Sequence, residues 1–162
     1  MQTDSQIWTI YFDTCCLSRL FDKQTQHRVL QETLAIRRIL GQIRAGSWYW
    51  ISSHALEEEV EQNPNLGQRF QIRDRLTDVN ETVSVGAREI SRGKQLEVLG
   101  FKELDALHIA CAESGNVDIF LTTDDGLLRR AKHNSSQLRV RVENPYTWLQ
   151  EIGENEHIGN DR

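Results

Sequence analysis

The sequence predicts an α/β fold of three layers, an α/β/α arrangement with a mainly parallel central sheet. Four short segments rich in β-branched and aromatic residues are separated by longer segments with helical periodicity. We expect strands at 7–12, 47–52, 118–123 and 138–143. Strands that alternate with helices in this way are typical of parallel sheets, because the crossover between two parallel strands is usually a helix.

The expected helices carry recognisable end signals. A helix is expected at 26–44, and Gly46 ends it before the second strand. Ser53 is an N-cap candidate for a helix at 53–62, which Asn63-Pro64 ends. The other helices are expected at 66–78, 86–98, 103–114 and 125–132.

The length and composition favour one domain. The 162 residues, 38% of them hydrophobic, suffice for a single core, which we expect to span residues 1–152. The polar segment 153–162, GENEHIGNDR, is expected to be a disordered tail. No apolar run approaches the roughly 18 residues that cross a bilayer, and the N-terminus lacks the basic start of a secretion signal. We therefore expect a cytoplasmic protein with no membrane association.

Charge and short motifs argue against several classes of protein. The net charge of -5 disfavours the wide basic surface of a non-specific duplex binder, although local basic contacts to nucleic acid remain open. The three cysteines, Cys15, Cys16 and Cys111, include no C-x-x-C pair, which disfavours a structural zinc site or a disulfide framework. No G-x-x-x-x-G-K-[ST] phosphate loop is present. We interpret the cysteines as small packing residues.

Two aspartates lie where the chain leaves a predicted strand. Asp13 follows the first strand, and Asp124 follows the third, in TTDDG. In open parallel sheets, ligands bind beyond the carboxyl ends of the strands, near the point where the strand order reverses. Each aspartate is equally well explained as the N-cap of the next helix, so neither alone indicates a site.

Two further acidic positions strengthen the case for a site. The run Glu57–Glu59 lies about one turn into a helix, so its members face different directions and most of them must be solvated. Asp105 lies in the first turn of the 103–114 helix among apolar residues, where a carboxylate requires a partner such as a metal ion. His108 is interpreted as a packed structural residue, because its neighbours are apolar.

Four segments in order, YFDTCCLSRLFD, ISSHALEEEVEQNP, ELDALHIACAE and DIFLTTDDGLLRRA, together resemble a PIN-domain protein of the VapC-like ribonuclease type. The resemblance covers nearly the whole chain, and DALHIA and TTDD are its most specific parts. It implies a PIN-like fold in which four acidic residues surround one or two divalent ions, Mg²⁺ or Mn²⁺. Three of these acids match Asp13, Asp105 and Asp124, and the fourth matches best at Glu58.

The same resemblance suggests secondary site residues. Thr122 matches a hydroxyl residue near the site, and Asp125 matches a neighbour that reaches the metal through water. Cys15 is a departure, because many members carry a small polar residue at that place.

The activity that the resemblance implies is metal-dependent hydrolysis of RNA phosphodiester bonds. The bound cation would offset the repulsion among the carboxylates and lower the pKa of a water nucleophile. The implied partners are an RNA substrate, a cognate antitoxin and a second copy of the chain. Three interpretations stay open: the toxin of a toxin–antitoxin pair, a housekeeping RNA-processing nuclease, and a catalytically silent PIN-like domain that binds RNA or protein.

Overall fold

The computed structural model describes the backbone of residues 6–160 and the side chains of residues 6–153. Over that range the strands are β1 (Thr9–Phe12), β2 (Tyr49–Ser53), β3 (Glu81–Val83), β4 (Ile119–Leu121) and β5 (Arg141–Glu143). The α-helices are α1 (Thr14–Arg19), α2 (His27–Arg44), α3 (His54–Glu61), α4 (Leu66–Leu76), α5 (Ala87–Val98), α6 (Glu103–Ser114), α7 (Asp125–His133) and α8 (Pro145–Asn160). Within residues 6–160, none of these helices combines the length and the hydropathy that a membrane span needs.

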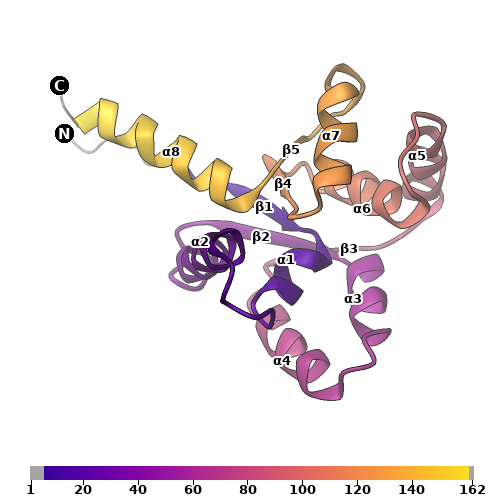
Figure 1. The fold of residues 1–162 in the computed structure, drawn as a ribbon. Coiled ribbons are helices and arrows are strands. Elements are labelled where there is room, and N and C mark those ends of the chain that lie inside the picture. The colour runs from indigo at the N-terminus through magenta and orange to yellow at the C-terminus, as the bar shows by residue number, and fades with distance from the viewer. Residues whose placement is uncertain (1–5, 161–162) are drawn as a thin grey trace.

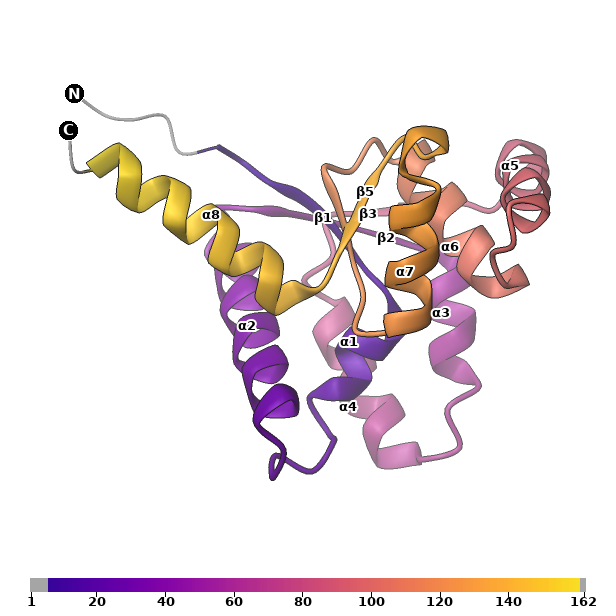
Figure 2. The ribbon, with the colours of Figure 1, turned by 45° about the horizontal axis from the view of Figure 1, so that its top comes forward.

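The sheet has the order β3-β2-β1-β4-β5, and all four strand pairings are parallel. The chain builds outward from β1 to β3 and then returns to place β4 on the other side of β1, so the order reverses between β1 and β4. Helices α1, α2 and α4 lie on one face and α5, α6 and α7 on the other (Figures 1 and 2). The predicted α/β fold class is thus confirmed.

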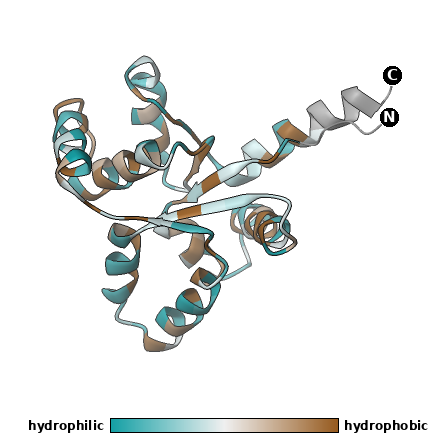
Figure 3. Cartoon of the chain, turned by 180° about the vertical axis from the view of Figure 1, so that it is seen from behind, coloured by the Kyte–Doolittle hydropathy of each residue, from teal (hydrophilic) through white to brown (hydrophobic). Residues whose placement is uncertain are grey.

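The central strands are buried on both faces. Ile10, Tyr11 and Phe12 of β1 have no exposed surface, and all of β4 is buried. Figure 3 shows hydrophobic residues along these inner strands and many hydrophilic residues on the surrounding helices. Because helices cover both sides, the strands are apolar runs rather than alternating patterns. This rigid centre holds the ends of β1 and β4 in fixed positions.

Three elements, α1, β3 and α8, were not predicted from the sequence. Strand β3 has three residues and pairs with β2 through Ser53 and Val83, and α1 has only six residues, so both lie below the length at which periodicity is informative. Helix α8 begins at Pro145, and the Asn144 side chain accepts bonds from the backbone N–H of Tyr146 (2.8 Å) and Thr147 (3.3 Å). An asparagine cap followed by proline was an available helix signal.

Helix α8 crosses the predicted boundary between the domain, 1–152, and the disordered tail, 153–162. The side chains of that tail beyond residue 153, and residues 161–162 altogether, lie outside the described part of the structure. The boundary therefore stays a prediction.

Helix α8 is anchored by a cluster of three tryptophans. Trp148, 1% exposed, makes edge-on contacts with Trp8 and Trp48, each at 5.5 Å between ring centroids. Trp8 precedes β1 and Trp48 precedes β2, so the cluster fixes α8 to the amino ends of the two strands. Figure 2 shows α8 running beside α2, at the far end of the sheet from α3 and α7.

Candidate active site

Asp13 follows β1 and occupies the N-cap position of α1, but its side chain makes no capping hydrogen bond. Instead its Oδ2 accepts hydrogen bonds from the Thr122 hydroxyl (2.8 Å) and the Cys15 thiol (3.3 Å). The alternative interpretation of Asp13 as a helix cap is therefore wrong. The carboxylate is 6% exposed and is held beside the end of β4.

Among the described side chains Asp13 has no cationic partner, unlike Glu32 and Glu113, two other buried carboxylates of this protein. Glu32 pairs with Arg19 at 3.0 Å, and Glu113 pairs with Arg92 at 2.7 Å. Among residues 6–153, no ion pair includes Asp13. Burial consequently raises the pKa of Asp13 well above its usual value. A buried carboxylate without a counter-charge is costly to keep ionised, so it marks a place for a cation.

Asp105 and Asp124 line one small cavity of about 60 Å³, together with Lys102 and Arg130. Asp105 comes from the first turn of α6, and Asp124 from the end of β4. Burial, and then the neighbouring Asp124 carboxylate, raise the pKa of Asp105. Two predicted site residues from distant parts of the chain are thus brought within electrostatic range of each other.

Asp124 is also a helix cap. Its Oδ1 accepts hydrogen bonds from the backbone N–H groups of Gly126 (2.8 Å) and Leu127 (3.2 Å), at the start of α7. Its own N–H donates to the Thr122 hydroxyl (3.1 Å), which in turn donates to Asp13. Thr122 therefore links the ends of β1 and β4, which is the place expected of it near the site.

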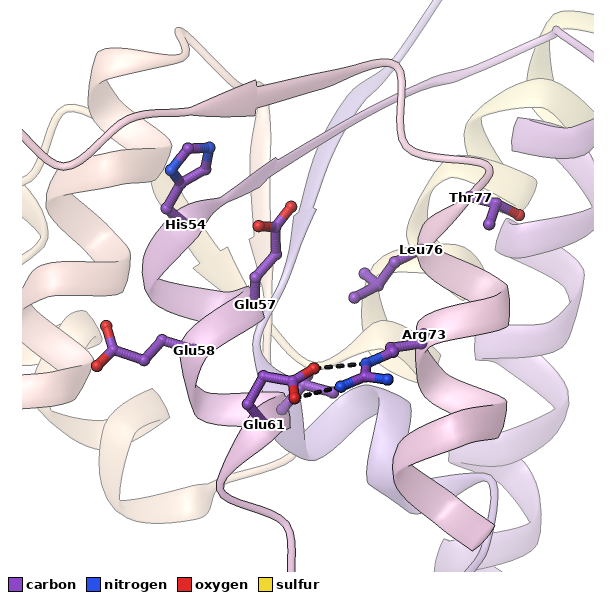
Figure 4. A pocket seen from close by; sticks show the side chains of 8 residues that line it. His54, Glu57, Glu58, Glu61, Arg73, Leu76 and Thr77 are labelled. Atoms are coloured by element: carbon purple, nitrogen blue, oxygen red, sulfur yellow. Dashed lines mark hydrogen bonds and ion pairs between the residues drawn. The ribbon is translucent and has the colours of Figure 1, made fainter. Parts of the chain in front are cut away.

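Within the glutamate run, the structure brings Glu59 rather than Glu58 to the other acids. Glu59 is half-buried, and its Oε2 lies 2.6 Å from Nε2 of His108. Its charge contributes to the raised pKa of Asp105. Glu57 and Glu58 are exposed and line a separate cavity of about 540 Å³ between α3 and α4 (Figure 4). The geometry therefore favours Glu59 over Glu58 as the fourth acid, and this assignment stays a proposal.

The phase of α3 explains this preference. The helix buries Ala55 and Leu56, and Glu59 lies four residues after the first and three after the second, so it shares their face. Glu58 is turned by about 100° from Glu59, toward solvent.

Asp125 is paired with Arg28. The guanidinium donates to both carboxylate oxygens, at 2.7 Å each, and to the carbonyl of Thr123 at 3.0 Å. This fork lowers the pKa of Asp125. Through Arg28, Asp125 braces the loop after β4, and its water-mediated contact to a metal ion stays a proposal.

Comparison with known proteins identifies the fold. A family model described as the PIN domain matches residues 10–133. The chain belongs to the PIN-domain family.

Two solved structures resemble this PIN domain at 14% sequence identity. The first is the crystal structure of VapBC2 from Rickettsia felis bound to a DNA fragment from their promoter, with a TM-score of 0.55, covering 84% of this chain and 98% of that one. The second is VapBC-1 from nontypeable Haemophilus influenzae, with a TM-score of 0.54, covering 85% and 98%. At this identity the likeness concerns the fold. No curated protein matches the chain.

The cysteines of this PIN domain have different environments. Cys16 and Cys111 have no exposed surface, which is the packing role expected of them. Cys15 is half-buried and contacts the site: its Sγ lies 3.3 Å from Asp13 Oδ2 and 3.3 Å from the Thr122 hydroxyl. Cys15 thus supports Asp13 in the place where many members carry a small polar residue.

The side-chain groups near the ends of β1 and β4 of this PIN domain are of the chemical type that binds a hard divalent cation. The groups near the ends of β1 and β4 are carboxylate oxygens, which Mg²⁺ and Mn²⁺ prefer. Among the side chains of residues 6–153, no three His, Cys, Asp or Glu residues are already spaced to hold a metal ion. The exposed carboxylate of Asp124 would therefore have to turn inward toward a cation.

The pH dependence of stability offers a test of the uncompensated charge at Asp13. In the unfolded chain its carboxyl ionises near pH 3.8, but the fold raises its pKa and so disfavours the charged form. Below pH 3.8 this penalty is absent, and it grows as the pH rises toward the raised value. In EDTA, the wild type should therefore lose stability relative to Asp13→Asn as the pH rises from 4.5 to 7.5. The urea concentration at the midpoint of unfolding should increase in the variant relative to the wild type over this range. A difference that stays constant with pH would contradict the raised pKa.

Proposed function

We propose that the protein is a divalent-metal-dependent endoribonuclease that hydrolyses RNA phosphodiester bonds. The observation that carries this proposal is the buried Asp13 carboxylate, which lacks a cationic partner at the point where the strand order reverses. Asp105 of α6, Asp124 at the N-cap of α7 and Glu59 of α3 supply further carboxylates. Membership of the PIN-domain family supports a nuclease at the coarser level.

The proposed roles of these residues follow from how deeply each is buried. Asp13 and Asp105, which are buried and half-buried, would anchor Mg²⁺ or Mn²⁺, while Glu59 and Asp124 complete the acidic cup directly or through water. Thr122 and Cys15 hold Asp13 in one orientation. When bound, the ion supplies a water of lowered pKa and a positive charge that offsets the phosphate. Lys102 and Arg130, beside Asp105 and Asp124, are positioned to attract the RNA backbone.

A role as the toxin of a toxin–antitoxin pair is the more specific form of this proposal. Its support is the likeness to VapBC2 and VapBC-1, one of which was solved on promoter DNA. This form implies a cognate antitoxin protein, a cytoplasmic location where RNA is available, and a homodimer. A small antitoxin-like reading frame beside the gene would favour it over a housekeeping processing nuclease.

A pair of neighbouring substitutions tests the site assignment. With a panel of structured RNAs and Mg²⁺ or Mn²⁺, Glu59→Gln is expected to slow cleavage roughly 10- to 100-fold, because it removes a charge from the acidic cup. Glu58→Gln should leave the rate within about twofold, because that side chain is exposed, whereas Glu59 is half-buried. Cleavage is measured from initial rates on end-labelled RNA.

Three results would contradict the proposal. Wild-type cleavage that persists in excess EDTA would exclude metal dependence. An equal loss of cleavage rate in Glu58→Gln and Glu59→Gln would show that the rate depends on the total negative charge of the run and not on the position of Glu59. Binding of the RNA panel with no cleavage under any of these ions would favour the catalytically silent interpretation.

A further inference from the structure

A buried chain of hydrogen bonds leads from β1 to Glu59. The Ser53 hydroxyl lies 2.6 Å from the Tyr11 hydroxyl, which lies 2.7 Å from Nδ1 of His108. Nε2 of His108 then lies 2.6 Å from Oε2 of Glu59. Ser53, Tyr11 and His108 are each at most 1% exposed, so only the glutamate at the end of the chain reaches solvent.

The direction of these bonds follows from the available protons. The Ser53 oxygen accepts from the backbone N–H of Leu56 (3.1 Å), which leaves its own proton for Tyr11. The Tyr11 hydroxyl has a single proton to donate, and it lies within hydrogen-bond distance of Nδ1 of His108. If that proton is donated to Nδ1 of His108, the neutral imidazole carries its hydrogen on Nε2 and donates it to Glu59.

The opposite direction would suit a different state of Glu59. An imidazole with its hydrogen on Nδ1 would donate to Tyr11, and its Nε2 would accept a proton from Glu59, which would then have to be a neutral acid. A carboxylate that binds a cation must be ionised. Of the two neutral forms of His108, only the one with its hydrogen on Nε2 therefore suits a metal site.

We propose that His108 and Tyr11 form a positioning device that fixes Glu59 through its Oε2 and leaves Oε1 free to face the cation. This inference rests on the proposed function and adds two positioning residues to it. His108 lies one turn after Asp105 on α6, so the helix that carries one acid also orients another, on α3. Buried histidine partners of this kind set the orientation of groups that bind metals.

A purely structural histidine predicts a different outcome. Loss of its hydrogen bonds would lower the free energy of unfolding, but the folded protein would bind a cation with unchanged affinity. A positioning role predicts weaker binding in a protein that is still folded. The two roles are therefore separated by the affinity for Mn²⁺ alone, measured without RNA from the electron paramagnetic resonance signal of the free ion.

Two substitutions at His108 give a sharp comparison. The amide nitrogen of glutamine reaches approximately the position of Nε2, whereas that of asparagine reaches only the position of Nδ1. We expect His108→Asn to weaken Mn²⁺ binding about tenfold and His108→Gln to restore most of the affinity. Tyr11→Phe, which keeps the ring, should weaken Mn²⁺ binding several-fold, because Nδ1 of His108 loses its hydrogen bond to the Tyr11 hydroxyl. Each variant is confirmed as folded by its thermal unfolding transition.

The controls are exposed residues of the same types, His54→Gln and Tyr49→Phe, which should bind Mn²⁺ like the wild type. In a Glu59→Gln background, His108→Asn should have no further effect, because the two residues act as one unit. Wild-type affinity in folded His108→Asn and Tyr11→Phe would overturn this inference while leaving the proposed function standing if Glu59→Gln is impaired. If the wild-type protein binds no Mn²⁺, both this inference and the proposed function are overturned.

Discussion

Replacing Asp13 by asparagine is expected to reduce RNA cleavage on the order of 10³-fold. Outer partners of metal ligands typically contribute about 10- to 100-fold, and Asp13 is proposed as a direct ligand, so its loss should exceed that range. The amide has nearly the same shape as the carboxylate, and one oxygen remains to accept the bond from Thr122. The effect should therefore appear in the rate of cleavage and in the affinity for Mn²⁺, without loss of folding.

The matched control is Asp74→Asn, at an exposed position on α4. Its cleavage rate and thermal stability should equal those of the wild type. If folded Asp13→Asn cleaves the RNA panel as fast as this control, Asp13 is not part of the catalytic machinery. The double substitution Cys15→Ser, Cys16→Ser would then be the next experiment, because Cys15 is the nearest other reactive group.

Truncation of Trp148 to alanine is expected to lower the free energy of unfolding by about 3–5 kcal/mol. The side chain is 1% exposed and stands between Trp8 and Trp48. Its removal leaves a cavity at the point where α8 meets the sheet. Urea denaturation followed by far-ultraviolet circular dichroism measures the loss without relying on tryptophan fluorescence.

Val98→Ala is the control for this experiment, because Val98 ends α5 and is 87% exposed. Its change in unfolding free energy should stay within about 0.5 kcal/mol. A Trp148→Ala protein as stable as this control would mean that α8 contributes little to the fold. Since Trp148 packs against residues that precede β1 and β2, whereas Asp13 and Asp124 follow β1 and β4, the folded fraction of the variant should keep its affinity for Mn²⁺.

The main elements of the fold were predictable because their signals are local. The helix at 103–114 was predicted with its bounds as observed, and 26–44 differs from α2 by one residue. The 26–44 segment has an apolar periodicity and ends before Gly46, whereas 103–114 is largely apolar and is buried over most of its second half. Strand β3 was not predictable in this way, since three residues become a strand only through pairing with β2. Helix α8 was not predicted, although Asn144 followed by Pro145 is a typical signal for the start of a helix.

The site was predictable as a set of acids but not in its connections. Asp13, Asp105 and Asp124 were found from their places after strands or in the first turn of a helix. The sequence could not choose between Glu58 and Glu59, because the phase of a helix depends on which side meets the core, and a run of three glutamates carries no such information. The partners of Asp125 and His108 come from residues about a hundred positions away, Arg28 and Tyr11.

The reversal of strand order also governs when the site can exist during synthesis. Asp13 leaves the ribosome early, but the strand that brings Asp124 and Thr122 beside it, β4, begins only at Ile119. A nascent chain that ends before this point has β1 without its neighbour, and its acids lie on unconnected segments. A translation product that ends before Ile119 therefore lacks the gathered carboxylates, so the proposed site forms only after β4 has been made.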